Sequence, residues 1–391
     1  MDRENVRKII SLRHLLHQHP ELSMQEVQTK GILMEFLREH TSLELVDRGS
    51  WFYAVKRAER EPAVAGSAEQ TRAERDLAEQ TLPARIAFRT DMDALPMGET
   101  IDLPYASLHP GISHKCGHDG HMAALCGLAM ELDLYDPGKT VYLIFQPGEE
   151  IGAGALICKD LLQEENISEI YAFHNLSGYP EGTVLYHPET TQPASEGLII
   201  RLTGRTSHAA EPEKGSNPAQ AIASIILEAQ KLAECEQKQL LFCTVTGVRV
   251  GAGDFGISPG DGELRMTLRS DAEPKMKELE SRILEFARER ADEFGLQMEF
   301  EIRDYFPETR NHPACLEKVR RAATQAGVPV MKMDSLWRPS EDFGYYLKEC
   351  PGALFYVGNG TGHPAVHTGA YDFNDRILEP AVDVLLRIAM E

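Results

Sequence analysis

The sequence predicts an α/β protein whose sheet is mostly parallel and has helices on both faces, with a domain of a second type inserted into it. In the first half of the chain, and again near its end, apolar segments typical of buried strands alternate with segments typical of helices. Between about residues 190 and 304 the order of expected elements changes to β-α-β-β-α-β, which is the order of a ferredoxin-like α+β unit. We therefore expect a discontinuous outer domain, residues 1–189 and 305–391, interrupted by an inserted domain at 190–304.

Apolar residues recur with helical spacing in the outer domain at 4–19 and 25–40, and Pro20 separates these two predicted helices. The segment 56–83 has almost no large apolar residues, so we expect a solvated excursion or a weak helix there. Further helices are predicted at 120–134, 153–165 and 313–326. The predicted strands of this domain are 43–46, 51–55, 84–89, 140–145, 169–173 and 353–357.

The inserted domain contains two predicted helices, at 217–234 and 274–294. Each of them follows one predicted strand and precedes another, which gives the α+β order. These strands are 196–202, 241–250, 262–269 and 296–305.

The charge balance excludes two classes of partner. The 391 residues include 40 Lys and Arg against 61 Asp and Glu, a formal net charge of −21. Nucleic acid and anionic membrane surfaces would repel such a chain, so we expect neither as a partner. No signal peptide and no apolar run of membrane-spanning length is visible, and the seven scattered cysteines do not form a disulfide framework. We therefore expect a cytoplasmic protein.

The segment from His114 to His121 holds a thiol, three imidazoles and a carboxylate. Cys116 and His118 are two residues apart, so in an extended segment their side chains point to the same face. A thiolate and an imidazole in that arrangement can chelate a metal ion. Taken alone, the segment could equally be a polar surface loop.

Polar side chains also follow four predicted strands of the outer domain. Because ligands of parallel sheets bind beyond the carboxyl ends of the strands, we expect these side chains to converge on one site. Each of them has a simpler explanation in isolation, such as a solvent-facing glutamate pair or a turn-capping aspartate. The residues are Asp91 and Asp93, Glu149 and Glu150, His174, and His363 and His367.

If the segment from His114 to His121 and the residues after the strands converge, they supply five ligands. Five ligands are more than a single tetrahedral zinc site needs, and these five include a carboxylate. They therefore favour two divalent metal ions that share a ligand, with Cys116 able to bridge as a thiolate. Zinc suits the set, but manganese, cobalt and nickel suit it as well. The five expected ligands are Cys116, His118, Glu150, His174 and His367.

Neighbouring side chains cannot take the same metal position, so the two adjacent glutamates are expected to have different roles. If Glu150 is a ligand, Glu149 is free to act as general base on the metal-activated water and to return the proton to the leaving amine. Asp91, Asp93 and Asp119 are candidates to accept hydrogen bonds from the ligand imidazoles.

Six ordered motifs then show a resemblance to a known family. The chain resembles the aminoacylase-type metallopeptidases, in the branch of hippurate hydrolases, indole-acetyl-amino-acid hydrolases and aminobenzoyl-glutamate hydrolases. The likeness runs nearly end to end. The motifs are LRHLLHQHPELS from Leu12, RTDMDALP from Arg89, CGHDGH from Cys116, FQPGEE from Phe145, SHAAEP from Ser207 and SEDF from Ser340.

The resemblance implies the same five ligands, Glu149 as the acid/base, and a zinc-peptidase-like catalytic domain with a lid that commonly forms a homodimer. It also implies that His208, in the lid, stabilises the tetrahedral intermediate, often from the partner subunit. Asn217 and Arg269 are the implied lid contacts of the substrate carboxylate.

The chain departs from the family pattern at four short segments. Lys115 stands where alanine usually precedes the cysteine, and Gly148 also stands where alanine is usual. The residues after His174 and the ISPG segment from Ile257 differ as well, and both lie on the expected substrate side. The expected function is hydrolysis of N-acyl-amino acids or related small peptide-like amides. A dipeptidase is the alternative within the class, and a non-catalytic metal-binding protein of the same fold is the alternative outside it.

Overall fold

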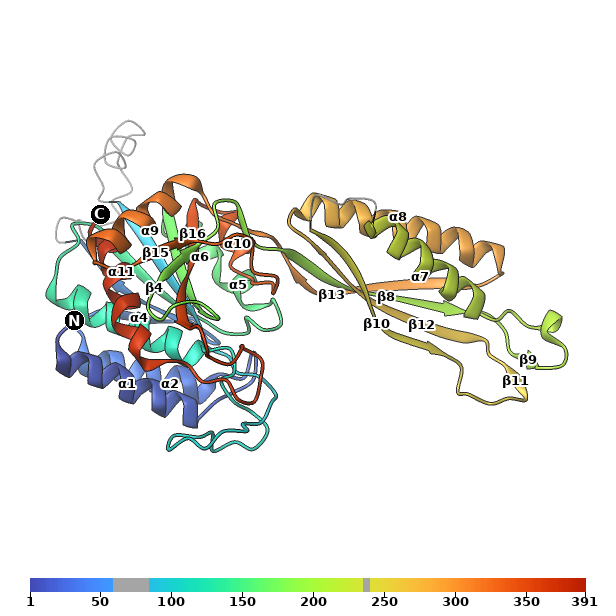
Figure 1. Cartoon of the computed structure of the whole chain (residues 1–391), viewed down its shortest axis with the longest axis horizontal. Coiled ribbons are helices and arrows are strands. Elements are labelled where there is room, and N and C mark those ends of the chain that lie inside the picture. The colour runs from blue at the N-terminus through green and yellow to red at the C-terminus, as the bar shows by residue number, and fades with distance from the viewer. Residues whose placement is uncertain (59–83, 235–239) are drawn as a thin grey trace, which may run out of the picture. The chain divides into compact units, whose positions relative to one another are not determined.

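The computed structural model describes residues 1–58, 84–234 and 240–391 (Figure 1). The predicted excursion at 56–83 therefore lies almost wholly outside the described residues. The chain divides into two compact units. The first unit comprises Met1–Thr191, Arg310–Ser335 and Asp342–Glu391, and the second comprises Gln192–Thr309 and Leu336–Glu341. The domain boundaries that the sequence predicts, 190 and 304, are not tested by this division and remain a prediction.

The first unit is built on an eight-stranded sheet with the order β1-β2-β4-β3-β5-β16-β6-β15. Its centre is parallel, because β3 pairs in parallel with β4 and β5, and β16 pairs in parallel with β5. Antiparallel pairs, β2 with β4 and β6 with β16, flank this centre. The strands are β1 (Glu44–Asp47), β2 (Phe52–Lys56), β3 (Arg85–Asp91), β4 (Thr140–Gln146), β5 (Glu169–Ser177), β6 (Val184–Tyr186), β15 (Val330–Lys332) and β16 (Gly352–Gly360).

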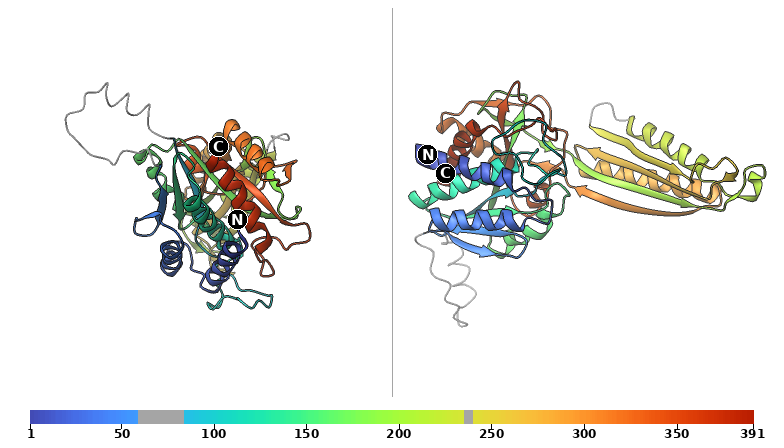
Figure 2. Two further views of the ribbon diagram at one scale, coloured as in Figure 1. Left: turned by 90° about the vertical axis from the view of Figure 1, so that its left-hand side faces the viewer. Right: turned by 90° about the horizontal axis from the view of Figure 1, so that it is seen from below.

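Helices cover the sheet of the first unit (Figure 2), and α4 is the most enclosed of them. Every α4 residue from His118 to Leu132 is buried, because α1, α2 and α11 pack on the side of α4 that faces away from the sheet. The start of α4 is thereby held in the interior. The helices are α1 (Arg3–Gln18), α2 (Val27–His40), α4 (His118–Leu134), α5 (Gly154–Cys158), α6 (Asp160–Glu164), α9 (Pro313–Gln325), α10 (Gly344–Leu347) and α11 (Leu378–Met390).

The predicted α/β class is confirmed. Elements such as β6, β15, α10 and α11 were not predicted, and two predicted elements differ in extent. The single helix predicted at 153–165 is divided into α5 and α6. The predicted strand 169–173 is longer, because β5 keeps its parallel pairing with β16 as far as Ser177. His174 therefore lies within a strand and not beyond its end.

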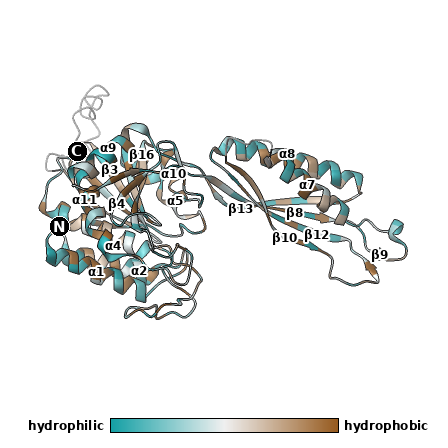
Figure 3. Ribbon diagram, in the orientation of Figure 1, coloured by the Kyte–Doolittle hydropathy of each residue, from teal (hydrophilic) through white to brown (hydrophobic). Residues whose placement is uncertain are grey.

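The second unit contains a four-stranded antiparallel sheet of order β10-β12-β8-β13, covered by two helices. The long helix α8 is largely hydrophilic in Figure 3, and its buried residues recur with helical spacing at Met276, Leu279, Ile283 and Ala287. The elements are β8 (Ala194–Thr203), α7 (Ala219–Glu234), β10 (Leu241–Val250), β12 (Asp261–Ser270), α8 (Glu273–Glu293) and β13 (Gln297–Phe306).

Short elements complete the two units. In the second unit β9 (Ser207–His208) pairs with β11 (Ile257–Ser258), and Pro212–Lys214 forms a 3₁₀ turn. A further two-stranded sheet joins β7 (Thr190–Gln192) and β14 (Thr309–Arg310). In the first unit Asp375–Ile377 forms a 3₁₀ turn before α11.

Candidate metal centre

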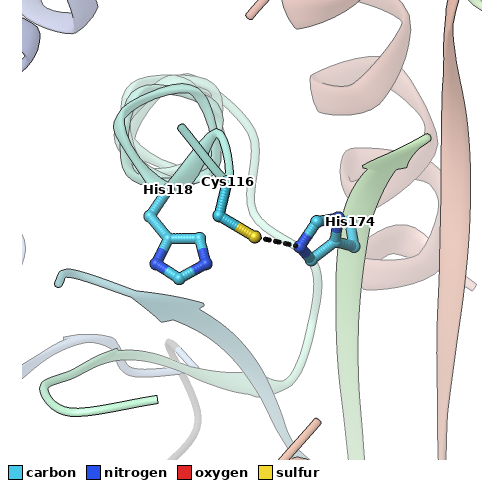
Figure 4. Close-up of side chains that lie close together, drawn as sticks. All are labelled: Cys116, His118 and His174. Carbon is cyan, nitrogen blue, oxygen red and sulfur yellow. Dashed lines mark hydrogen bonds between the residues drawn. The ribbon is translucent and has the colours of Figure 1, made fainter. Parts of the chain in front are cut away.

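Cys116 and His118 are positioned by the start of α4. His118 is the first residue of the helix, and Gly117 between them adopts a left-handed conformation with φ of 98°. A Cβ at Gly117 would collide with the side chains of Asn175 and Tyr371, so only glycine fits there. The turn directs the thiol of Cys116 and the ring of His118 toward β5, which carries His174 (Figure 4).

Two groups of potential ligand atoms meet at Cys116. The Sγ atom of Cys116 lies 3.4 Å from Nε2 of His174, and His118 belongs to the same group. The same Sγ atom lies 3.3 Å from Nε2 of His367, which in turn lies 3.5 Å from Oε1 of Glu150. The five expected ligands are therefore brought together, and Cys116 is common to both groups.

The donor atoms of this cluster fit a bound cation. Within the described residues, Nε2 of His118 and Oε1 of Glu150 are buried and have no hydrogen-bond partner. They lie 3.8 Å apart, too far for a hydrogen bond but close enough to serve a common ion. Thiolate, imidazole and carboxylate together are a donor set for zinc and neighbouring divalent metals.

The charge around His118 also favours a cation. Burial by itself would lower the pKa of His118, but the charge of Asp91, a hydrogen bond that the ring donates to Asp93 and the charge of Glu150 raise it to about 10. The surrounding carboxylates thus stabilise positive charge at this ring. A divalent ion can take the place of that proton.

Backbone carbonyl groups orient two of the ligand rings. Nδ1 of His118 lies 2.9 Å from the carbonyl oxygen of Asp93, and Nδ1 of His174 lies 2.7 Å from that of Asn175. Each Nδ1–H donates to its carbonyl, so each Nε2 presents a lone pair to the centre. Burial, followed by the charge of nearby His121, lowers the pKa of His174, which keeps this ring neutral.

The three predicted supporting aspartates have different contacts. Asp93 supports a ligand ring as expected, with Oδ1 lying 3.3 Å from Nδ1 of His118. Asp91 lies 3.8 Å from His118 and accepts hydrogen bonds from His121 and Arg89. Asp119 requires a correction. Among the described residues its carboxylate contacts no ligand imidazole, because it lies 2.8 Å from His17 and 3.1 Å from Arg13 of α1.

The loop that carries Glu149 and Glu150 is held by two buried carboxylates. Asp93 accepts a hydrogen bond of 2.9 Å from the backbone N–H of Glu150, and Glu26 accepts one of 2.7 Å from Gly148. Burial and the nearby charge of Asp93 raise the pKa of Glu26 to about 7. The side chain of Glu149 is buried, with one oxygen 3.8 Å from Nε2 of His118. Glu149 and Glu150 thus lie at the same distance from His118 and form one group of potential ligands with it, whereas only Glu150 also groups with Cys116 and His367.

The sequence did not reveal Glu26, Lys115 or Asn175 as residues of this neighbourhood. Each is brought there by contacts that are distant in the chain, such as Glu26 with Gly148. Lys115 left one signal in the sequence. A residue directly before a ligand cysteine is expected to be buried, and lysine is rarely buried unless it is paired.

The remaining predicted residues belong to the second unit. His208 is exposed in β9, and its Nδ1 accepts a hydrogen bond of 3.1 Å from the backbone N–H of Ala210. Asn217 caps α7 by accepting from Ala219, and its amide group donates to Ser258. Arg269 donates to the hydroxyl of Ser340 and to a nearby carbonyl group.

Comparison with known proteins identifies the family. The model of peptidase family M20/M25/M40 matches residues 87–391, and the chain belongs to this family of metallohydrolases. Among the described residues, no helix has the length and apolar character needed to cross a membrane.

Individual relatives match over nearly their whole length. The chain is 30% identical to the N-acetylcysteine deacetylase of Bacillus subtilis (strain 168), with 92% of this chain and 91% of the relative covered. It is 26% identical to the N-acetyldiaminopimelate deacetylase of Lacticaseibacillus casei (strain BL23), covering 97% and 96%. The solved structure of the YXEP protein of Bacillus subtilis, a dinuclear metal-binding peptidase of family M20, aligns with a TM-score of 0.82 at 26% identity, covering 100% of this chain and 98% of that one.

Proposed function

We propose that the protein is a metal-dependent amidohydrolase that cleaves the amide bond of N-acyl-amino acids or related small peptide-like amides. One observation carries the proposal: four potential ligand side chains surround the thiol of a fifth, Cys116, and the buried carboxylate of Glu149 lies directly beside them. The deacetylases among the relatives support an acyl-amino-acid substrate.

Cys116, His118, Glu150, His174 and His367 would hold two divalent ions, and Cys116 belongs to both groups of potential ligands. When bound, the ions lower the pKa of water and polarise the amide carbonyl group. Zinc, manganese, cobalt and nickel all suit these ligands.

Glu149 is the residue of this chain that moves the proton. Its carboxylate oxygen takes a proton from the attacking water molecule, which then forms the bond to the carbonyl carbon. The same carboxyl group gives that proton to the nitrogen as the C–N bond breaks, so a carboxylic acid and an amine leave. Adjacent Glu150 is held by Asp93 through its backbone N–H, which fixes the positions of both glutamates.

His208 is equipped to donate a hydrogen bond to the developing oxyanion. Because the N–H of Ala210 donates to Nδ1, the neutral ring carries its proton on Nε2. Nε2–H can then donate to a substrate oxygen. Asn217 and Arg269 of the same unit are the proposed contacts of the substrate carboxylate.

The proposal extends to the assembly and location of the enzyme. We expect a homodimer formed through the second unit, a cytoplasmic location, and neither nucleic acid nor membrane as partner. The net charge of −21 supports the last of these expectations.

A hydrolysis screen tests the proposal. The apoprotein, reloaded in turn with zinc, manganese, cobalt and nickel, is offered N-acetyl and N-benzoyl amino acids beside unblocked dipeptides. We expect the acylated substrates to be cleaved. Cleavage of dipeptides alone would indicate the dipeptidase alternative, and bound metal without hydrolysis of any amide would indicate a binding protein.

The substitution Glu149→Gln tests the mechanism. It removes the proton acceptor and keeps the volume of the side chain, so kcat should fall by about 10³-fold while metal content stays near two ions per chain. Full activity in this variant would show that another group carries the proton.

A further inference from the structure

The ligand His367 is held differently from the other two ligand histidines. Its side chain is 49% exposed, whereas the ring of His118 is fully buried and His174 is 4% exposed. Its backbone is left-handed, with φ of 59°. A residue other than glycine in that conformation costs about 1 kcal/mol or more, so the surroundings must hold it there.

Lys115 supplies that hold at two points of the segment that carries His367. The carbonyl oxygen of Lys115 accepts a hydrogen bond of 2.7 Å from the backbone N–H of His367. The Nζ atom of the same lysine donates a hydrogen bond of 2.8 Å to the carbonyl oxygen of Tyr371. The segment from 367 to 371 is therefore fixed at both ends by one residue, which directly precedes the bridging Cys116.

The ammonium group of Lys115 is itself held rigidly. The residue is fully buried, and Nζ lies 2.6 Å from Oε1 of Glu99. Glu99 also accepts from His17 and from the backbone N–H of Ser107. A buried ion pair of this kind is costly to disrupt, because removal of one partner leaves the other charge uncompensated.

We propose that Lys115 is a positioning residue for one of the two metal sites, the site formed by Cys116, Glu150 and His367. The inference rests on the two-ion centre of the proposed function. Loss of the ammonium group releases Tyr371 and the end of the segment, so His367 no longer stays in its left-handed position. The site formed by Cys116, His118 and His174 keeps its ligands, because backbone carbonyls and burial hold those rings.

Cobalt titration of the apoprotein tests the inference without any measurement of activity. Wild type should bind two equivalents of Co²⁺, followed by the visible absorption bands and the thiolate-to-metal band. Lys115→Met keeps most of the side-chain length and removes the charge. In this variant the first equivalent should bind as in wild type, and the second about 10- to 100-fold more weakly, as is typical when a group that orients a ligand is lost. Lys332→Met, at an exposed lysine of β15, is the matched control and should titrate as wild type.

The outcomes separate the inference from the proposed function. If wild type binds only one equivalent, the two-ion centre is wrong and the inference falls with it. If wild type and Lys115→Met both bind two equivalents with equal affinity, or if the variant weakens both equally, the role of Lys115 is overturned while the two-ion centre stands.

A second variant covers the case in which Lys115→Met does not fold. Glu99→Gln leaves the lysine in place and weakens its anchor, and Glu99 contacts none of the five ligands among the described residues. We expect the same selective weakening of the second equivalent, with a smaller factor. Unchanged binding of both equivalents in a folded Glu99→Gln protein would again overturn the inference.

Discussion

The proposed ligand histidines of the first unit and His208 of the second unit differ in how the backbone hydrogen-bonds the imidazole ring. His118 and His174 are buried, and each donates from Nδ1 to a backbone carbonyl group. His208 is exposed, and its Nδ1 accepts from a backbone N–H group. In both cases one backbone hydrogen bond selects the tautomer. The direction of that bond decides whether Nε2 offers a lone pair, as a metal ligand must, or a proton, as an oxyanion donor must.

The largest expected effect concerns the exposed histidine. His208→Ala should lower kcat on an N-acyl-amino acid by about 10²- to 10³-fold, the usual cost of removing one oxyanion donor. Because His208 is exposed, the midpoint of urea unfolding should not change. Steady-state kinetics and urea titration measure both quantities. A variant with normal kcat would show that the tautomer of His208 has no role in the reaction.

The next effect concerns a buried histidine that is not among the proposed ligands, His17. Burial lowers the pKa of His17, but hydrogen bonds to Asp119 and Glu99 outweigh it and raise the value to about 9. Protonated His17 therefore adds stability that is fully present below pH 6.5 and is lost as the pH rises through 9. His17→Gln should reduce the free energy of unfolding by roughly 3 kcal/mol at pH 6 and by much less at pH 9.5.

Urea unfolding of both proteins at a series of pH values measures this difference. A gap between wild type and His17→Gln that stays constant from pH 6 to 9.5 would contradict the charged state of His17. The same series also reports whether the contact of α1 with Asp119 contributes to stability at all.

A smaller effect is expected at Asp93, which contacts both the ring of His118 and the backbone N–H of Glu150. Asp93→Asn weakens its contacts with His118 and with the N–H of Glu150, so the affinity for both ions should fall by about 10- to 100-fold. Competition with a chromophoric chelator gives the two affinities. The exposed Asp47→Asn serves as control, and selective loss of one ion would show that Asp93 serves only one of its two neighbours.

The smallest effect is expected for the surface ion pairs of the second unit, in contrast to the buried ion pairs of the first. Arg201 bonds Glu263 and Glu301 on the open face of the second sheet. Because such exposed pairs gain little in water, Arg201→Ala should change the free energy of unfolding by less than about 1 kcal/mol. A larger loss in urea titration would mean that this face is covered in solution.

The fold and the ligands could be predicted because their signals are local. Alternating apolar runs indicate strands. The residues beyond or near the strand ends gave Glu150, His174 and His367, and the segment from His114 to His121 gave the other two side chains that the structure brings together. The prediction for Asp119 failed for a geometric reason. Next to a ligand in the chain, it points toward α1 and pairs with His17 and Arg13. Sequence adjacency at the start of a helix does not give a common direction, because successive side chains diverge by about 100°.

Glu26 and Lys115 could not be found from the sequence for a different reason. The role of Glu26 depends on a contact with Gly148, and that of Lys115 on contacts with Glu99 and Tyr371. Such pairs are made by folding. Nothing in the local pattern marks Glu26, and the unusual lysine at position 115 does not indicate which residues it contacts. Their burial as charged groups becomes visible only in three dimensions.

The position of β16 in the sheet has a consequence for the order in which the protein is made. This strand comes from residues 352–360, yet it lies between β5 and β6 in the interior of the first sheet. All the strands of the second unit are synthesised before it, so that unit can fold while the first still lacks one of its inner strands. His367 and α11, which covers α4, emerge later still. Closure of the first sheet therefore awaits synthesis of β16, and the proposed ligand His367 follows that strand in the chain.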